Sequence, residues 1–430
     1  MIMNQNIAPE LKTTLIEPLH LLERTFLKKR ALIQSWFKAE WEKTRPPIYG
    51  SVDLRNAGFK LAPIDMNLFP AGFNNLNPAY LSQSISAARK SILQHAEDTK
   101  KILLIPESHT RNLFYWENMQ VLLDIIHQAG FEARLGSLTT EPLEITLQNG
   151  EKIIVEPIAR EHDALHLSAF VPDLILLNND LSDGIPPILQ QLKQRLIPPA
   201  ELGWSQRLKS GHFQYYAAVA NEFAQQMDID PWFIAPLFRH CGEIDFMQRS
   251  GMDCLVRNAA FLFDEIKKKY EQYQIQQQPF LVIKADAGTY GMAVMTVRNI
   301  EELKTLNRKQ RTHMAMTKGG QPVRRVIIQE GVYTFETIGE SQFVAEPVVY
   351  LWGECVVGGF YRVHKDRGID ESLNAPGMHF EPLAFSQTCD NPCDEASLNA
   401  CQNRFYTYGI IAQLSMLAAA REIKDQKKSL

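Results

Sequence analysis

Residues 280–295 read FLVIKADAGTYGMAVM, a lysine followed by a glycine-containing segment. An apolar run ends in Lys284, and a loop with Gly288 and Gly291 precedes a second apolar run. A lysine at a strand end can pair with phosphate oxygens, and glycines let backbone N–H groups approach other oxygens. The stretch predicts either a phosphate-binding loop or a plain β-hairpin, in which the glycines only form the turn and Lys284 reaches solvent.

Charged residues elsewhere in the chain give this loop a context. Neither GxxxxGK[ST] nor GxGxxG occurs, so the two commonest phosphate-binding turns are not expected. Lys209 precedes the loop in WSQRLKSGHF, and Glu330 follows it in VIIQEGV. A strand pair then carries Glu346 on one arm and Arg362 on the other. This order resembles the ATP-grasp fold, in which two α+β subdomains hold ATP between them.

The ATP-grasp resemblance implies a nucleotide site and a metal site. Two lysines would bind the phosphates, the glycine-rich loop would be a lid, and a hinge glutamate would face the nucleotide. The implied ATP-binding residues are Lys209, Lys284, Gly288, Thr289, Tyr290, Gly291 and Glu330. Acidic residues downstream would hold Mg²⁺. The usual Glu-x-Asn metal motif does not occur after residue 381, and the candidate metal ligands are Glu346, Glu371 and Asn374.

The pattern of apolar runs predicts a mixed α/β and α+β chain. Strand-like runs at 101–106, 151–158 and 172–180 alternate with helix-length segments, which indicates an α/β layer with a largely parallel sheet. Proline-rich stretches at 185–188 and 196–203 suggest a boundary. We therefore expect an N-terminal packing helix (1–47), an α/β substrate-binding domain (48–200) and an ATP-grasp domain of two α+β subdomains (201–430).

The segment SVDLRNAGFKLAPIDMNLFPAGFNN (51–75) is dense in polar residues among small residues and prolines. It fits either a solvated loop or an amino-acid pocket, in which cations pair a carboxylate and acids pair an α-ammonium group. Arg111 follows the next predicted strand, at the sheet edge where α/β proteins usually bind ligands. The candidate substrate-binding residues are Asp53, Arg55, Asn56, Lys60, Asp65, Asn67, Asn75 and Arg111.

Three motifs carry a closer resemblance: this segment, KADAGTYGMAV and LNAPGMHF. With them, the chain is similar to the proteobacterial glutamate–cysteine ligases that are built on an ATP-grasp fold, from about residue 48 to 425. That family commonly has glycine at the positions of Ala71 and Ala293, and threonine at that of Met66. The exchange at Met66 would alter pocket polarity, but none of the three removes a charge.

The resemblance implies that ATP phosphorylates the γ-carboxylate of L-glutamate and that the amine of L-cysteine attacks the acyl phosphate. The product, γ-glutamylcysteine, is the first intermediate of glutathione biosynthesis. Lys284 and Arg362 would be the catalytic cations, because phosphoryl transfer needs alignment and charge neutralisation. The same cations would also serve another carboxylate–amine ligase, such as a glutathione-synthetase-like enzyme, or a non-catalytic nucleotide-binding protein.

Bulk properties limit partners and location. The net charge of −4 gives no reason to expect nucleic acid, and no run of about 18 apolar residues predicts a membrane span. The N-terminus shows no signal-peptide pattern, and six separated cysteines suggest reduced thiols, so we expect a cytoplasmic protein. The sequence does not decide between a monomer and a homo-oligomer.

Overall fold

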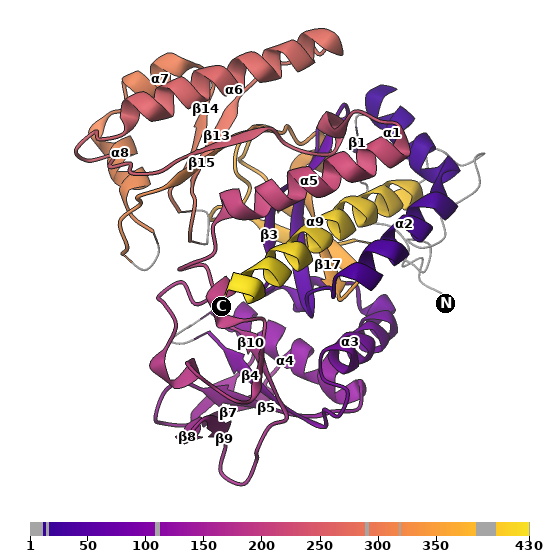
Figure 1. Ribbon diagram of the computed structural model, residues 1–430, viewed down its shortest axis with the longest axis vertical. Helices are drawn as coiled ribbons and strands as arrows, with labels where there is room; N and C mark the ends of the chain where they lie inside the picture. Colours follow the sequence, from indigo (N-terminus) through magenta and orange to yellow (C-terminus); the bar gives the residue numbers. More distant parts are fainter. Residues whose placement is uncertain are drawn as a thin grey trace.

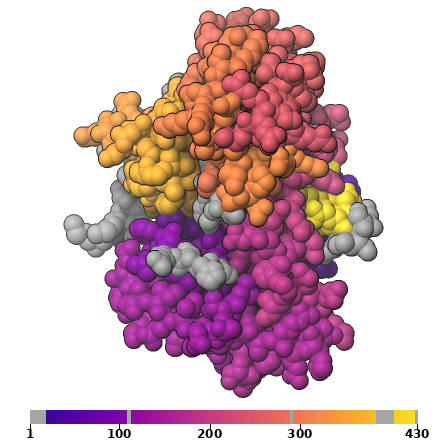
Figure 2. All heavy atoms as spheres, turned by 90° about the vertical axis from the view of Figure 1, so that its left-hand side faces the viewer, coloured from indigo at the N-terminus to yellow at the C-terminus, as the bar shows by residue number. Residues whose placement is uncertain are grey.

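The computed structural model describes residues 12–13, 17–107, 112–288, 292–317, 320–383 and 401–429. Three larger sheets and their helices make a mixed α/β protein that is elongated along one axis (Figure 1). The four-stranded sheet lies at one end of this axis, the six-stranded sheet lies at the other, and the seven-stranded sheet lies between them. In the space-filling view the four-stranded region forms the upper part of the molecule and the six-stranded region forms the lower part (Figure 2).

The six-stranded sheet is the α/β layer that the sequence predicts. The strand order is β11-β10-β4-β5-β7-β6, and all neighbours are parallel except β6 and β7. Helices α3 (Leu81–His95) and α4 (Leu113–Gln128) belong to this region. The strands are β4 (Lys101–Pro106), β5 (Glu132–Ser137), β6 (Leu143–Thr146), β7 (Lys152–Pro157), β10 (Leu174–Asn178) and β11 (Arg195–Ile197). The predicted strands at 101–106, 151–158 and 172–180 are thus confirmed.

The seven-stranded sheet combines strands from the N-terminal and the C-terminal parts of the chain. Its path is β1-β16-β17-β18-β19, and β2 pairs with both β17 and β3. The strands are β1 (Lys12–Thr13), β2 (Tyr49–Asn56), β3 (Leu61–Asn67), β16 (Glu336–Ile338), β17 (Phe343–Trp352), β18 (Cys355–His364) and β19 (His379–Pro382). Residues 49–53 of β2 pair with β17, and β3 pairs with β2, so this segment belongs to the central sheet. The expected domain boundaries stay a prediction.

Helices pack on this central sheet around a large apolar core. They are α1 (Glu17–Lys28), α2 (Arg30–Lys43), α5 (Lys209–Met227) and α9 (Cys401–Ser429). The N-terminal packing helix is thus two helices, and α5 lies along α9 near the axis of the molecule (Figure 1). Phe26, Phe223 and Tyr408 are fully buried in this core. No helix among those described is long and apolar enough to cross a membrane.

The four-stranded sheet is antiparallel, in the order β12-β15-β13-β14. Its strands are β12 (Phe238–Cys241), β13 (Leu281–Ala285), β14 (Val294–Val297) and β15 (Val326–Glu330). Its helices are α6 (Met252–Gln272), α7 (Ile300–Lys304) and α8 (Arg308–Ala315). The short elements of the chain are β8 (Ala159–Glu161), β9 (Ala164–His166) and the 3-10 helices η1 (Phe73–Asn75), η2 (Pro78–Tyr80), η3 (Pro187–Leu189), η4 (Ala200–Leu202) and η5 (Pro231–Phe233).

The tip of the β2–β3 hairpin connects the central sheet to this end region. The turn is closed by hydrogen bonds from Ala57 N to Lys60 O (2.9 Å) and from Gly58 N to the Asn56 side chain (2.8 Å). Phe59, 1% exposed, packs against Trp232 and other aromatic rings of the four-stranded region. The hairpin tip is therefore part of the core of another region, and it fixes the two sheets relative to each other.

Candidate active site

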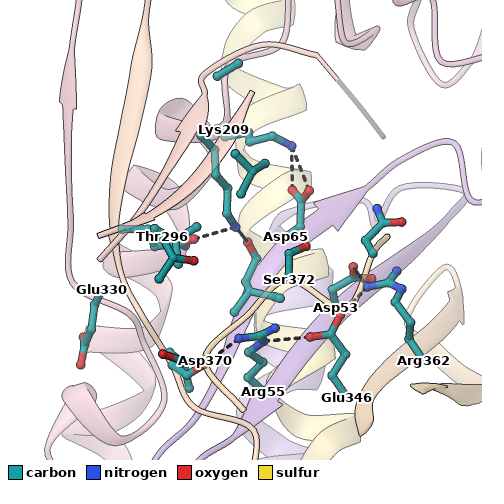
Figure 3. Close-up of a pocket in the computed structure, with 18 of the residues that line it drawn as sticks. Asp53, Arg55, Asp65, Lys209, Thr296, Glu330, Glu346, Arg362, Asp370 and Ser372 are labelled. Carbon is teal, nitrogen blue, oxygen red and sulfur yellow. Dashed lines mark hydrogen bonds and ion pairs between the residues drawn. The ribbon is translucent and has the colours of Figure 1, made fainter. Parts of the chain in front are cut away.

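A cleft between the four-stranded and the seven-stranded sheets collects most of the predicted charged residues (Figure 3). One wall comes from β13, β14 and β15, and the other from β2, β3, β17 and β18, with the first residue of α5 between them. Five carboxylates face four cationic side chains in the lining. These residues are Asp53, Asp65, Glu330, Glu346 and Asp370, and Arg55, Lys209, Lys284 and Arg362.

Strand β13 places Lys284 in the cleft by simple alternation. Leu281, Ile283 and Ala285 are buried in the core beneath the sheet, and Val282 and Lys284 point to the opposite face. The Lys284 Nζ donates to the Ile64 carbonyl (2.8 Å) and to the side-chain oxygen of Gln329 (3.0 Å). The lysine of the opening motif thus lies inside a cleft, and this excludes the interpretation in which it extends into solvent.

Burial sets the ionisation of Lys284. Removal from water lowers the pKa of its ammonium to about 8, and the neighbouring Lys209 and Arg55 act in the same direction. The carboxylate of Asp65 opposes this shift without cancelling it. The side chain therefore changes charge close to neutral pH, where an anionic ligand would favour its protonated form.

Lys209 is held at the start of α5 by two contacts. Its Nζ donates to both carboxylate oxygens of Asp65 (3.0 and 2.9 Å) and lies 3.8 Å from the ring centroid of Trp204. The carboxylate of Asp286 accepts from the Ser210 N–H and hydroxyl, both at 2.7 Å. Asp286 thereby caps the helix from the loop after β13, which ties that loop to Lys209.

A buried ionic network joins β2 to the β17–β18 hairpin. Glu346 accepts from Arg55 Nε (2.8 Å) and from Arg362 Nη1 (2.6 Å), and the same Nη1 also donates to Asp53 (2.8 Å). Burial alone would raise the pKa of Glu346, but the two arginines outweigh it and hold the pKa below its usual value. For Asp53 burial prevails over Arg362, and its pKa is raised.

Two lining residues have buried donors without partners among the described residues. These donors are Arg362 Nε and Gln329 Nε2. An unpaired buried donor costs roughly 1–3 kcal/mol, more when the group is charged. Arg55 differs from Arg362, because its Nη1 donates to the Val332 carbonyl (3.2 Å) and its Nη2 donates to the Glu371 carbonyl. Arg362 and Gln329 are therefore the donors that an acidic or polar ligand would satisfy.

Glu330 borders the cleft, but its carboxylate is used elsewhere. Its oxygens accept from Lys60 Nζ (2.7 Å), Trp232 Nε1 (3.0 Å) and the Leu237 N–H (2.9 Å), and the Lys60 and Glu330 side chains are each 1% exposed. In Figure 3 Glu330 lies apart from the Lys209–Asp65 pair. Lys60, expected to bind a substrate carboxylate, thus pairs with the glutamate expected to face the nucleotide.

Several other predicted residues lie outside the cleft lining. Asn56 donates to the buried Glu336 (3.0 Å), and Asn67 bonds to the backbone of Phe69. Asn75 ends η1, and the side chain of Glu371 accepts from the Gly368 N–H (2.8 Å). The predicted site residues Arg111, Thr289, Tyr290 and Gly291 lie outside the described residues.

The expected metal ligands differ in their surroundings. Glu346 lines the cleft and forms ion pairs with Arg55 and Arg362. Glu371 forms an ion pair with Arg367. Asn374, an uncharged residue, also lines the cleft. Within the described part of the chain no three His, Cys, Asp or Glu side chains cluster as metal ligands. The metal role of Glu346, Glu371 and Asn374 therefore stays a prediction, and both glutamates already have cationic partners in this structure.

The sequence interpretation missed an apolar slot and a glutamine. Val282, Val294 and Thr296 cover the four-stranded side of the cleft together with Val332, which follows β15, and Ile64 of β3 lies on the opposite side. The pairing of Val282 with Thr296 on β14 and with Gln329 on β15 puts all three on one face. The sequence did contain a signal for Gln329. Successive side chains of a strand point to opposite faces of the sheet, so Gln329 and Glu330 in VIIQE are expected on different faces.

Comparisons with known proteins agree on one family. Residues 23–423 match the family described as Glutamate-cysteine ligase (GshA). The chain is 49% identical to a candidate gamma-glutamylcysteine synthetase from Methylobacillus flagellatus KT, with a TM-score of 0.90 over 98% of this chain and 99% of that chain. No curated protein sequence matches.

Two more distant structures are similar only at low scores. A glutathione synthetase-like effector from Globodera pallida is 10% identical, with a TM-score of 0.37 over 87% of this chain and 86% of that chain. D-alanyl-alanine synthetase A from Vibrio cholerae O1 is 8% identical, with a TM-score of 0.33 over 74% and 81%. Scores at this level carry no argument about the fold or the site.

Proposed function

Since the chain belongs to the glutamate–cysteine ligase family, we propose that the cleft between its two antiparallel sheets is an ATP-grasp active site. The protein is an ATP-dependent glutamate–cysteine ligase, an enzyme of glutathione biosynthesis. The observation that carries the site assignment is the convergence of Lys209, Lys284 and Arg362 on one cleft that also has an apolar slot.

We assign the nucleotide to the side of the four-stranded sheet. The adenine ring would enter the slot between Val282, Val294 and Ile64, where it removes apolar surface from water. The triphosphate would then reach Lys209 and Lys284, with Gly288 close by at the start of the predicted lid. Gln329 Nε2, buried without a partner, would donate to the nucleotide.

We assign L-glutamate to the side of the seven-stranded sheet. Arg362 is fixed by Asp53 and Glu346 and keeps an unpaired Nε, so it can approach the γ-carboxylate and the phosphoryl group that is transferred to it. The raised pKa of Asp53 would return toward its usual value when the α-ammonium group of the substrate binds beside it. Attack by the L-cysteine amine on the γ-glutamyl phosphate would complete the ligation, and no protein nucleophile is needed.

Charge balance supports a divalent cation with the nucleotide. The five carboxylates of the lining are balanced by its four cationic side chains together with Lys60, the partner of Glu330, and ATP adds about four negative charges. Mg²⁺ usually takes one or two protein carboxylates and completes its shell with phosphate oxygens and water. Asp65 is our candidate ligand, because phosphates that bind Lys209 would release this carboxylate beside them. Bound Mg²⁺ would neutralise charge on the transferring phosphoryl group.

Trapping of the acyl phosphate tests this proposal. Wild-type enzyme with ATP, Mg²⁺, L-glutamate and hydroxylamine, but without cysteine, should form γ-glutamyl hydroxamate. Lys284→Met should lose hydroxamate and γ-glutamylcysteine formation together while its melting temperature stays within a few degrees of the wild type. If Lys284→Met keeps near-normal turnover, or if wild-type enzyme forms the dipeptide but no hydroxamate, the proposed site or intermediate is wrong.

A further inference from the structure

Two cysteines are in contact at the edge of the four-stranded sheet. Cys241 is the last residue of β12, and Cys254 lies in the first turn of α6. Their Sγ atoms are 3.7 Å apart, and both are free thiols. The side-chain amide of Asn258 donates to both sulfurs, at 3.1 and 3.4 Å. One polar group thus holds the two thiols side by side.

The surrounding loop fixes this arrangement. Residues 242–253 connect the two cysteines, and the loop is closed by a hydrogen bond from Asp245 N to Ser250 O (3.0 Å). A second bond, from Ile244 N to Arg324 O (2.9 Å), attaches the loop to the segment before β15. A disulfide has an S–S distance of about 2.05 Å, so the two sulfurs need to approach by roughly 1.7 Å. Rotation of the side chains and a small shift of the first helical turn can supply this movement.

The pair lies at the end of the sheet that carries the glycine-rich loop. Cys241 is in register with Val326 on β15, and Val326 is in register with Ala285 on β13. Strand spacing puts Cys241 roughly 10 Å from Ala285. Asp286, the next residue, caps α5 at Lys209. A covalent bond at Cys241 would therefore fasten the end of the sheet from which the cleft loop begins.

We propose that Cys241 and Cys254 form a reversible intrachain disulfide by exchange with low-molecular-weight disulfides. The half-buried Cys254 thiolate attacks one sulfur of the small disulfide, which forms a mixed disulfide and releases one small thiolate. Cys241 gives its proton to water and attacks the Cys254 sulfur, and the second small thiolate leaves. Two protein thiols are oxidised, and one small disulfide is reduced to two thiols.

The order of attack follows from burial. Cys241 is 3% exposed, and burial together with the adjacent Cys254 raises the pKa of its thiol to about 11. Cys254 is more accessible, so it meets the oxidant first. The disulfide of the enzyme's own acceptor, L-cysteine, belongs to the class of oxidants that this pair would accept. The state of the pair would therefore report whether the cysteine supply is reduced.

Tryptic mapping of the full-length enzyme tests the proposal. Cleavage after Arg239, Arg249 and Arg257 places the two cysteines in separate peptides, 240–249 and 250–257. The enzyme is equilibrated in glutathione and glutathione disulfide, quenched with N-ethylmaleimide and digested. The cross-linked peptide pair should rise from about one-tenth to about nine-tenths of the total over a hundredfold change in the ratio of glutathione disulfide to the square of glutathione. Dithiothreitol should reverse it.

Single variants separate the two steps. Cys241→Ser should stop at a glutathione adduct on peptide 250–257, and Cys254→Ser should leave peptide 240–249 unmodified. Cys355→Ser, a matched change at a cysteine outside this pair, should leave the cross-link unchanged. The wild-type map alone decides the case if a variant fails to fold. Both thiols alkylated at every glutathione ratio, or a wild-type adduct at Cys254 without a cross-link, would overturn the proposal.

Discussion

The lowered pKa of Lys284 gives a quantitative prediction for nucleotide binding. Free enzyme loses the Lys284 charge with a pKa of about 8, because the side chain is buried in the cleft. Bound phosphates would favour the charged form, so binding above pH 8 must take up a proton. Roughly nine-tenths of Lys284 is charged at pH 7 and one-tenth at pH 9. The dissociation constant for ATP should therefore increase about tenfold between these pH values, which corresponds to ~1.4 kcal/mol.

Isothermal titration calorimetry with ATP and MgCl₂, without amino acids, measures this constant. Titrations in two buffers of different ionisation enthalpy should show an uptake that approaches one proton per ATP at pH 9. Lys284→Arg is the matched control, because a guanidinium stays charged over this range. Its affinity should change little with pH, and effects of phosphate ionisation would be common to both proteins. A flat wild-type profile, or the same slope in Lys284→Arg, would refute the reasoning.

Four further variants test two residues of the cleft, the Lys60–Glu330 ion pair and the tip of the β2–β3 hairpin. Lys60→Met should lower the free energy of unfolding by about 3–5 kcal/mol in a denaturant titration, because it leaves the charge of Glu330 buried and unpaired, and adding Glu330→Gln should recover part of the loss. Phe59→Ala should cost about 3–5 kcal/mol in the same assay, since it empties the hairpin tip, and a loss below 1 kcal/mol would argue against the packing role. Arg362→Lys should reduce kcat by about 10²-fold or more with a smaller effect on ATP affinity, and an equal loss in both would indicate simple binding. Asp65→Asn should tighten ATP binding in EDTA, because it removes a like charge, and should weaken the response to Mg²⁺; an unchanged Mg²⁺ response would exclude Asp65 as a ligand.

Local patterns predicted much of this structure. The alternation in LVIKA located both the strand and the face of Lys284, and the turn at Gly353 and Glu354 separates β17 from β18 as expected. The order Lys209, Lys284, Arg362 correctly indicated residues that line one cleft. Such features depend on neighbours in the chain, so short stretches contain the necessary information.

Contacts between distant segments were not predictable in this way. Nothing near Lys60 shows that it pairs with a carboxylate 270 positions later, and nothing in VIIQE shows that Glu330 bonds to Leu237. Each cation of a polar segment looks equally suited to a substrate, and only the fold decides which one has a protein partner. The surroundings of Glu346 were not predictable for the same reason, because the two arginines that enclose it come from different strands.

The pairing of β2 with β17 has a consequence for synthesis on the ribosome. The hairpin emerges early, but its partner strand, 343–352, is translated nearly 300 residues later. At roughly 5–20 residues per second the hairpin waits about 15–60 s for this partner strand. All strands of the largely parallel sheet of residues 101–197 are made during this interval, whereas the cleft still lacks β17 and β18. The first hairpin of this ligase therefore lacks its neighbour in the central sheet until the last third of the protein is being made.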